Sequence, residues 1–396
     1  MTETSLPWTP DFENYSVDYA ITSVETTDQA VSILWSDGRN SEHHVLWLRE
    51  NSPDEETVHP LSREMLIDPL AIPDDIRATE ASIADNGALV VAWSDRAEKS
   101  HYHPGWLRTH AWFESADSEP VSSVCLWSTT ELNEPVTVNY DAASADDTVF
   151  VSWLEALRDY GVARLSGIPV RDGMLEEIVE RIGTIRPTNF GKLFQVVVKN
   201  DPNSNAYTSS SLVPHMDLGT REMPPGLQFL FCRENSTTGG EGVYVDAYRI
   251  AEDMRRDEPQ HFEDLSTIVW EFNNRARDSD YRAQGPIFSL DDNGKLKEVR
   301  YTPWLRAPLR APIDIQRRAY TSIRAFMRRN ADPKYQLHVT YRPGDLLAFD
   351  NRRVLHGRSS YSEAGGNRHL EGCYADRDDL HSAIRLLRRN NHLATA

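Results

Sequence analysis

The sequence predicts a mainly β protein of the α+β class, in which a small N-terminal β domain precedes a larger domain with flanking helices. Two observations lead to this fold. Short runs rich in β-branched and aromatic residues alternate with turns from about residue 190 to residue 376, and two similar hairpin patterns fill the first 110 residues. Antiparallel strands at this density are typical of a barrel-like double sheet. The clearest strand candidates of the larger domain are residues 226–232, 242–245, 336–341 and 345–349.

The N-terminal domain is expected to contain two related β-hairpin modules. Residues 31–49 carry the pattern W-S-D, S-x-x-H and W-L-R, and residues 90–108 carry it again about sixty residues later. The segment 110–145 that follows is rich in Ser, Asp and Glu. We therefore place residues 1–115 in the N-terminal domain and residues 116–396 in the larger one.

Helices are predicted at both ends of the larger domain. Apolar residues recur at helical spacing over residues 146–160, where Asp146 or Asp147 can cap the first turn. A short strand at 162–165 and a second amphipathic helix at 174–185 follow. A basic helix over residues 376–390 is better explained by packing or dimer formation than by nucleic-acid binding.

Composition and charge exclude several classes of protein. The 42 Lys and Arg residues against 61 Asp and Glu give a formal charge of −19, which disfavours nucleic acid and anionic membranes as partners. The three cysteines are far apart, so neither a disulfide framework nor a thiolate cluster is indicated. An export signal and an apolar run long enough to span a membrane are also missing from the sequence. We expect a cytoplasmic protein.

One pattern points to a metal. His215 and Asp217 form an H-x-D pair on one face of an expected strand, and His356 follows 139 residues after Asp217. Two imidazoles and one carboxylate suit a ferrous ion and leave positions open for oxygen and a chelating acid. The alternative is that both histidines are ordinary buried residues bonded to backbone. Because a Gly-Asp turn and a His-Gly-Arg block surround the remote histidine, the pattern favours an iron-dependent oxygenase with no catalytic residue beyond the metal ligands.

Arg368, twelve residues after His356, is the candidate for holding an acid beside the metal. Its planar guanidinium can donate two hydrogen bonds to one carboxylate, as the far end of 2-oxoglutarate would require. Arg352, Arg353 and Arg358 compete for the role. Surface salt bridges explain those three more simply.

These motifs resemble the γ-butyrobetaine dioxygenase and trimethyllysine dioxygenase family of 2-oxoglutarate oxygenases. The likeness runs nearly end to end and rests on the N-terminal β domain and on a set of short motifs in the larger one. Those motifs are Asn205-Ala-Tyr207, His215-Met-Asp217, Pro225-Gly-Leu-Gln228, Thr238-Gly-Gly240 with Val245-Asp246, and the segment from Arg368 to Asp376.

The resemblance implies a fold, a set of cofactors and an assembly. The expected core is a double-stranded β-helix, the jelly-roll arrangement of cupin-like proteins. Iron would be bound by His215, Asp217 and His356, 2-oxoglutarate by Arg368, and the chain would form a homodimer. The implied chemistry couples O2 and 2-oxoglutarate, which yields succinate and CO2, to hydroxylation of one substrate C–H bond.

The sequence departs from the family in its N-terminal domain. Relatives often carry a zinc-binding cluster of cysteines after the first W-L-R-D-N segment, whereas residues 51–59 here contain no cysteine. His59, His101 and His103 remain without thiolates to support them. We therefore expect no zinc in this domain.

An aromatic cage for a trimethylammonium group is also implied by the resemblance. Its positions in this sequence are Phe190, Phe194, Tyr207 and Tyr374. Relatives commonly have Tyr and Trp at the first two positions, so the cation–π attraction should be somewhat weaker here. The alternative is that both phenylalanines belong to the core.

The anionic end of the substrate is less clearly marked. The resemblance implies an asparagine where this chain has Ser204, and γ-butyrobetaine enzymes have an asparagine-rich strand where it has residues 300–304. Asn274, Arg275 and Arg221 are candidates for the gained contacts. Gaining Arg and losing Asn favours a highly charged head group. The favoured reaction is hydroxylation of 2-(trimethylammonio)ethylphosphonate to its 1-hydroxy product, and the alternative is γ-butyrobetaine to L-carnitine. Arg221 and Arg275 could instead be surface residues.

Other classes of function are weaker candidates. A non-catalytic cupin-like binding protein would keep the sheets but would need neither His356 nor Arg368. A hydrolase is disfavoured because the sequence has no G-x-S-x-G, no H-E-x-x-H and no phosphate-binding loop. Residues 190–215 are the expected lid over the substrate.

Overall fold

The computed structural model describes residues 5–113, 124–197, 209–274, 279–362 and 366–395, and the side chains of these up to residue 390. The chain divides into two compact units, Met1–Ser122 and Ser123–Ala396. The predicted boundary between residues 115 and 116 lies outside the described residues. No described helix is both long and apolar enough to cross a bilayer.

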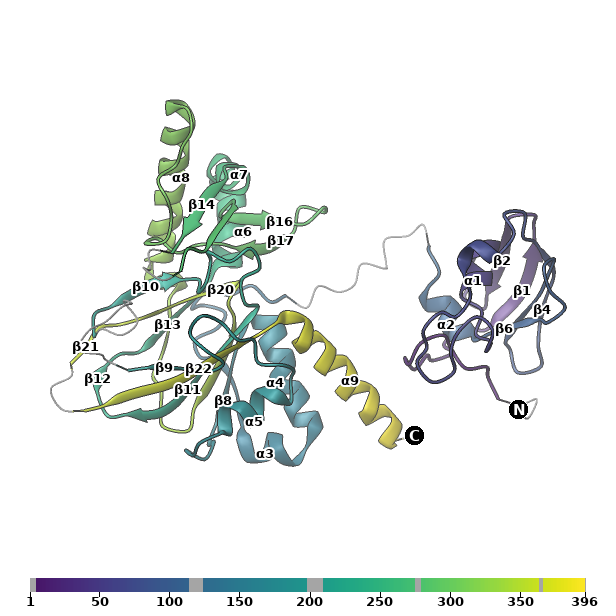
Figure 1. Ribbon diagram of the computed structural model, residues 1–396, viewed down its shortest axis with the longest axis horizontal. Coiled ribbons are helices and arrows are strands. Elements are labelled where there is room, and N and C mark those ends of the chain that lie inside the picture. Colours follow the sequence, from purple (N-terminus) through teal and green to yellow (C-terminus); the bar gives the residue numbers. More distant parts are fainter. Residues whose placement is uncertain (1–4, 114–123, 198–208, 275–278, 363–365, 396) are drawn as a thin grey trace. The chain divides into compact units, whose positions relative to one another are not determined.

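The first unit contains the two predicted modules, each a three-stranded antiparallel sheet followed by a short helix (Figure 1). In both modules the tryptophan of the repeated pattern donates its indole N–H to the serine, from Trp35 to Ser41 over 2.9 Å and from Trp93 to Ser100 over 2.7 Å. The prediction of related hairpin modules is confirmed. The elements are β1 (Ile21–Thr26), β2 (Ala30–Trp35), β3 (Asn40–His44), α1 (Val45–Glu50), the 3-10 turn η1 (Pro69–Ala71), β4 (Ala78–Ile83), β5 (Leu89–Trp93), β6 (Ser100–Tyr102) and α2 (Pro104–Thr109).

A polar network occupies the loop where the sequence lacks cysteines. Arg96 donates to Asp54 over 2.5 Å and to Ser100 over 2.7 Å, and Ser52 donates to Asp54 over 2.6 Å. Burial alone would raise the pKa of Asp54, but the hydrogen bonds from Arg96, Ser52 and Thr57 outweigh it and lower that pKa to about 2. His103 instead accepts backbone N–H groups at the start of α2. The absence of zinc stays a prediction.

The second unit is built on two facing sheets. The six-stranded sheet has the order β7-β8-β19-β11-β22-β9, and the four-stranded sheet has the order β10-β20-β13-β18. Side chains from both sheets meet in one buried cluster, so the expected double-stranded β-helix is confirmed. The strands are β7 (Val136–Asn139), β8 (Val162–Ser166), β9 (Phe194–Val196), β10 (Leu212–His215), β11 (Leu227–Asn235), β13 (Gly242–Asp246), β18 (Leu337–Val339), β19 (Leu346–Asp350), β20 (Val354–Arg358) and β22 (Arg368–Ala375), with β12 (Thr238–Gly239) paired to β21 (Tyr361–Ser362).

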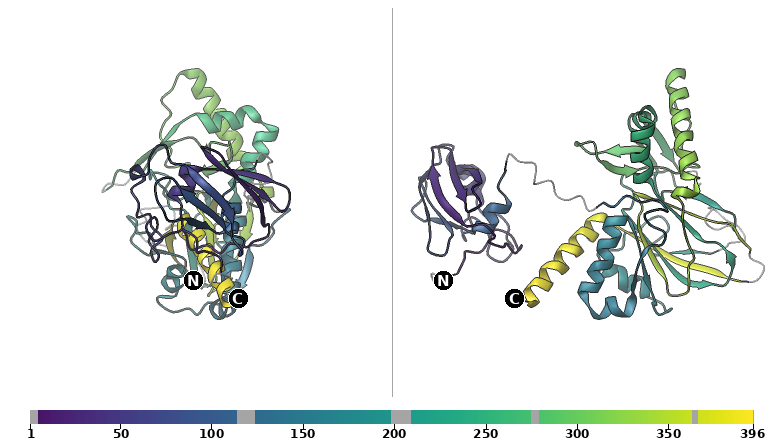
Figure 2. Two further views of the ribbon diagram at one scale, coloured as in Figure 1. Left: turned by 90° about the vertical axis from the view of Figure 1, so that its right-hand side faces the viewer. Right: turned by 180° about the vertical axis from the view of Figure 1, so that it is seen from behind.

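Helices cover the outer face of the six-stranded sheet, while its inner face looks toward the smaller sheet (Figures 1 and 2). Strand β19 shows how the alternation works, because Leu346 and Ala348 pack under the helices whereas Leu347 and Phe349 pack between the sheets. The covering helices are α3 (Tyr140–Ala145), α4 (Asp147–Tyr160), α5 (Met174–Glu180) and α9 (Arg377–Thr395). Asp146 caps α4 as predicted. Helix α5 ends at Glu180, five residues before the predicted end at 185, because the chain turns through residues 181–183.

The segment between β13 and β18 differs from the expectation of short strands alone. It holds three helices and four strands around a core of its own. Arginine is frequent in the longest of these helices, so its apolar stripe is thin and is carried by Ala319, Ile323 and Phe326. The elements are α6 (Ala247–Asp257), α7 (Pro259–Thr267), β14 (Trp270–Asn273), β15 (Arg282–Gly285), β16 (Phe288–Leu290), β17 (Leu296–Val299), α8 (Ile313–Asn330) and the turn η3 (Pro333–Tyr335).

Candidate active site

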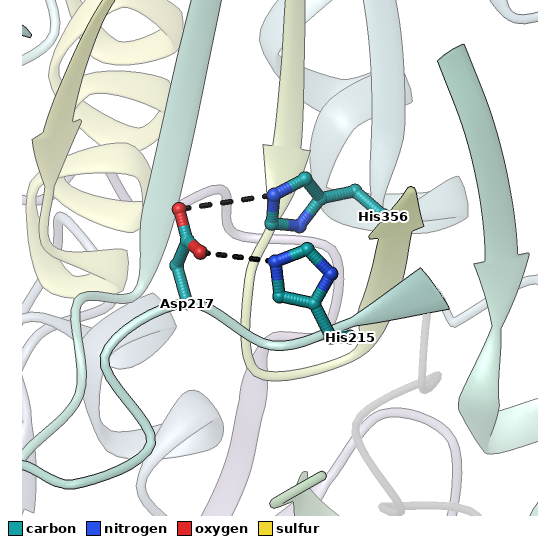
Figure 3. A group of neighbouring side chains, drawn as sticks. All are labelled: His215, Asp217 and His356. Carbon is teal, nitrogen blue, oxygen red and sulfur yellow. Dashed lines mark ion pairs between the residues drawn. The ribbon is translucent and has the colours of Figure 1, made fainter. Parts of the chain in front are cut away.

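The three predicted metal ligands converge at the end of the smaller sheet. His215, the last residue of β10, lies directly opposite His356 in β20, and their ring centroids are 4.5 Å apart. Asp217 follows β10, with Oδ1 3.3 Å from His215 Nε2 and Oδ2 3.7 Å from His356 Nε2 (Figure 3). The ligand atoms all lie within 4.8 Å of one another, and no other such group of three occurs among the described residues. The geometry is that of a 2-His-1-carboxylate site.

Neighbouring groups hold these ligands in orientation. His215 Nδ1 lies 2.9 Å from the Val213 carbonyl, so Nδ1 carries the proton and Nε2 keeps its lone pair for a metal. Asn351 accepts the Asp217 N–H over 2.9 Å and donates to the Asp217 carbonyl over 3.0 Å. Tyr374 donates its hydroxyl to Asp217 Oδ2 over 2.8 Å. The carboxylate is therefore fixed from its backbone and from its side chain.

The electrostatics keep the triad in the state that binds metal. Burial alone would raise the pKa of Asp217, but His356, His215 and Tyr374 outweigh it and hold this pKa well below its usual range. Burial lowers the pKa of His356 to about 3, which the charge of Asp217 only partly opposes. At neutral pH Asp217 is thus a carboxylate and His356 a neutral imidazole, as binding of a divalent cation requires.

Arg368 lies in the same cavity and has no described acid beside it. It is 8% exposed, and its guanidinium has no hydrogen bond or ion pair with any side chain or carbonyl that the structure describes. The rings of Tyr341 and Tyr361 lie 6.0 and 5.7 Å from its Cζ. A buried, unpaired guanidinium is costly unless a ligand neutralises it. An organic acid such as 2-oxoglutarate meets that need.

The competing arginines have other partners, and not the ones expected. Arg352 pairs with Glu298 over 2.7 Å, and both side chains are largely buried. Arg353 is fully buried and pairs with Asp246 over 2.8 Å, and Arg358 is 5% exposed and lines the cavity, where it donates to the Ser210 carbonyl. The expectation of surface salt bridges is therefore wrong for Arg353 and Arg358, and the ion pair of Arg352 does not lie on the surface either. Burial and then the charge of Arg368 lower the pKa of Arg358 to about 10, so this end of the cavity is electropositive.

Three of the four predicted cage residues line the cavity. Phe194 and Tyr374 stack with centroids 5.1 Å apart and planes 30° apart, and Phe190 lies at the mouth with 43% of its surface exposed. Tyr207 lies outside the described residues. Because Tyr374 also bonds Asp217, the aromatic wall and the metal site share a residue.

Of the residues predicted to bind the anionic end of the substrate, those that the structure describes are not among the residues that line the cavity. Asn274 donates to Ser279 over 2.8 Å and accepts the Tyr281 N–H over 2.6 Å, so its side chain is used within its own loop. Arg275 lies outside the described residues. Arg221 lies over the ring of Tyr281, with Cζ 3.2 Å from the centroid, and lines a second, polar pocket. Contact of any of them with substrate stays a prediction.

Sequence reasoning missed several residues that line the cavity. These are Gln228, Tyr244 and Tyr341. Trp304 is not one of the lining residues, but its ring centroid lies 4.5 Å from that of His215. Strand alternation could have identified Gln228. In β11 it lies on the same face as Leu230, which packs between the sheets, and on the opposite face from Phe229, which packs under the helices. Tyr244 lies in the apolar run Val243–Val245, and Tyr341 has the same spacing as the buried Leu337 and Val339, so no sequence pattern separates them from core residues.

Comparisons with known proteins agree with this geometry. Residues 95–374 match the family described as taurine catabolism dioxygenase TauD, TfdA, and residues 22–108 match that described as gamma-butyrobetaine hydroxylase-like, N-terminal. The chain is 40% identical to gamma-butyrobetaine dioxygenase of Pseudomonas sp. strain AK-1 over 96% of this chain and 99% of that one. It is 30% identical to the human gamma-butyrobetaine dioxygenase over 93% and 97%, and 26% identical to trimethyllysine dioxygenase of Meyerozyma guilliermondii over 94% and 96%.

The resemblance seen in the sequence is thereby confirmed. The His-Asp-His group and the unpaired Arg368 fit the cofactors of that family, a ferrous ion and 2-oxoglutarate. The chain belongs to the TauD, TfdA dioxygenase family, with an N-terminal unit of the gamma-butyrobetaine hydroxylase-like type, and is an oxygenase that uses Fe(II), 2-oxoglutarate and O2.

Proposed function

We propose that the protein hydroxylates a small trimethylammonium alkyl acid, with γ-butyrobetaine as the first candidate substrate. The observation that carries the proposal is the stacked pair Phe194 and Tyr374, which forms an aromatic wall beside the metal ligand Asp217. Aromatic faces attract quaternary ammonium groups through their quadrupole and offer the methyl groups apolar contact. A trimethylammonium group on this wall would hold the attached alkyl chain near the metal.

The chain's residues have separate tasks in this reaction. Bound Fe(II), 2-oxoglutarate and O2 supply the oxidising chemistry and give succinate and CO2. His215, Asp217 and His356 would hold the metal, and Arg368 would hold 2-oxoglutarate. The aromatic wall positions the substrate, so that one C–H bond is presented. Apolar side chains of the inner sheet faces keep water from the reacting carbon.

The head group at the other end of the substrate defines two candidates. The relatives named gamma-butyrobetaine dioxygenase support a carboxylate, since one of them is 40% identical over nearly the whole chain. A phosphonate, as in 2-(trimethylammonio)ethylphosphonate, needs more cationic donors. Arg221 supports that candidate, because it lines a pocket together with Leu218, the residue that follows the metal ligand Asp217. Arg275 would serve the same head group.

The proposal is tested by measuring how much succinate the enzyme forms from 2-oxoglutarate with and without each candidate substrate. We expect γ-butyrobetaine or the phosphonate to stimulate 2-oxoglutarate turnover. The carbon isostere of γ-butyrobetaine, 5,5-dimethylhexanoate, should bind about tenfold more weakly because it lacks the cation. Failure of both ammonium compounds would refute the substrate class. If neither compound nor any other candidate stimulated iron-dependent decarboxylation, the non-catalytic binding protein would be the better description.

Variants separate the two head groups. If the phosphonate is the substrate, Arg221→Ala or Arg275→Ala should raise its KM by about tenfold and change that of γ-butyrobetaine less. Arg282→Ala is the control, because this arginine is exposed and its ion pair in the described part of the chain is with the exposed Asp280. Better turnover of γ-butyrobetaine would assign the carboxylate substrate. We also propose the homodimer, which analytical ultracentrifugation would test.

A further inference from the structure

Two buried tyrosines share the inner end of the cavity with Arg368. Tyr244 in β13 and Tyr341, which follows β18, are 1% and 3% exposed, and both line the cavity. Their hydroxyl groups hydrogen-bond to each other. Neither hydroxyl has another protein partner among the described residues. The guanidinium of Arg368 lies 6.0 Å from the Tyr341 ring.

A count of protons shows that this pair is incomplete. Two hydroxyls carry two protons, and their mutual hydrogen bond uses one of them, whichever oxygen is the donor. The other O–H remains as a buried donor with no acceptor from the described chain. Buried donors are normally satisfied, and leaving one unpaired costs about 1–3 kcal/mol. An acceptor from outside the chain would remove that cost.

The backbone around the pair is adapted to its position. A Cβ added at Gly242 would lie 2.8 Å from Cε2 of Tyr244 and 3.0 Å from Cε2 of Tyr341. Only glycine therefore lets both rings occupy this end of the cavity. Burial raises the pKa of both hydroxyls above their usual range, which keeps them protonated as donors at neutral pH.

We propose that Tyr244 and Tyr341 form, with Arg368, the anchor for the distal carboxylate of 2-oxoglutarate. The guanidinium supplies the charge, and the unpaired hydroxyl supplies a neutral donor directed at the same anion. A carboxylate has two oxygens and about four acceptor sites, so it can accept from both groups at once. The tyrosine pair thereby helps the site to prefer a dicarboxylic 2-oxo acid over one that ends in a methyl group.

This inference depends on the 2-oxoglutarate chemistry of the family and not on the proposed trimethylammonium substrate. It is tested by equilibrium binding of 2-oxo acids to the Fe(II) protein without oxygen or substrate, followed by the visible charge-transfer band of the iron chelate. Tyr341→Phe and the double variant Tyr244→Phe/Tyr341→Phe should raise the Kd of 2-oxoglutarate by about ten- to a hundredfold. Tyr244→Phe alone should cost less, because Tyr341, whose ring lies 6.0 Å from the Arg368 guanidinium, keeps its proton for the ligand.

The control ligand is 2-oxopentanoate, which has the same five carbons but no distal carboxylate. Its Kd should change by less than about twofold in all three variants, because it cannot accept the hydroxyl proton. Tyr301→Phe is the matched protein control, since Tyr301 is buried outside the cavity. Unchanged affinity for 2-oxoglutarate in the double variant would refute the proposal, as would an equal loss for 2-oxopentanoate. If one variant fails to fold, as judged by thermal unfolding, the remaining single variant decides.

Discussion

Replacing Tyr374 with phenylalanine is expected to weaken iron binding while it leaves the aromatic wall in place. The hydroxyl donates to Asp217 Oδ2 over 2.8 Å, whereas the ring stacks on Phe194 at 5.1 Å. The substitution removes only the first interaction. Because the ring is retained, any loss of metal affinity can be assigned to the hydroxyl.

The size of the effect follows from the kind of bond. A hydrogen bond from a neutral donor to a carboxylate is worth about 1.5–3 kcal/mol when the site is buried. Residues that orient metal ligands typically change metal affinity by about 10- to 100-fold. Since Asn351 still fixes the backbone of Asp217, we take about 2 kcal/mol, or roughly thirtyfold in the Kd for Fe(II).

The assay is an anaerobic competition titration of Fe(II) against a coloured chelator, together with the KM for the best substrate. Phe194→Leu is the matched control, because it removes the partner ring and leaves the bond to Asp217. It should raise KM and change the Kd for Fe(II) by less than about twofold. A Tyr374→Phe protein that binds Fe(II) as tightly as the wild type would refute the reasoning, and so would an equal loss in Phe194→Leu.

Three further predictions concern the metal and the stability of each unit. His356→Ala should lower iron content by at least about tenfold in elemental analysis, whereas the exposed His338→Ala should not. Arg353→Met should lower the free energy of unfolding of the second unit by about 3–5 kcal/mol in thermal denaturation, because it leaves Asp246 buried and unpaired; a loss below 1 kcal/mol would contradict this. Asp54 has a folded pKa of about 2, below its unfolded value, so its contribution of about 2 kcal/mol is present above pH 4 and is lost as pH falls from 4 toward 2. Acid titration of Asp54→Asn should lack that loss, and identical acid limbs would contradict the assignment.

The parts of the site that sequence could predict are those governed by local spacing. Arg368 and Tyr374 are six residues apart in one strand, so they fall on one face, and His215 and Asp217 are separated by a single residue at the end of β10. That face is the inner one, as the packing of Leu370 between the sheets shows. That His215 meets His356 depends on the register of β10 against β20, and no local sequence pattern indicates this register.

What could not be predicted depends on tertiary contacts. Arg353 sits in an arginine-rich turn that looks like surface, yet it is buried because Asp246 lies opposite, 107 residues away. Asn274 is an attractive ligand by residue type, but its own loop uses both ends of its amide. In each case the partner, and not the residue type, decides the role.

The charges around the cavity give a physical reason for its choice of acid. Asp217 contributes one negative charge, and histidines that bind a metal do so as neutral imidazoles, so the triad with a ferrous ion would have one net positive charge. Arg368 adds a positive charge at the other end, where Arg358 also lines the cavity and carries charge. 2-Oxoglutarate is a dianion with one carboxylate for each of these two positive regions. A monocarboxylic 2-oxo acid would leave Arg368 buried and uncompensated, which costs more than a lost contact at the surface. Selectivity for the dianion therefore follows from the distribution of charge in the cavity, whatever the identity of the substrate that is hydroxylated.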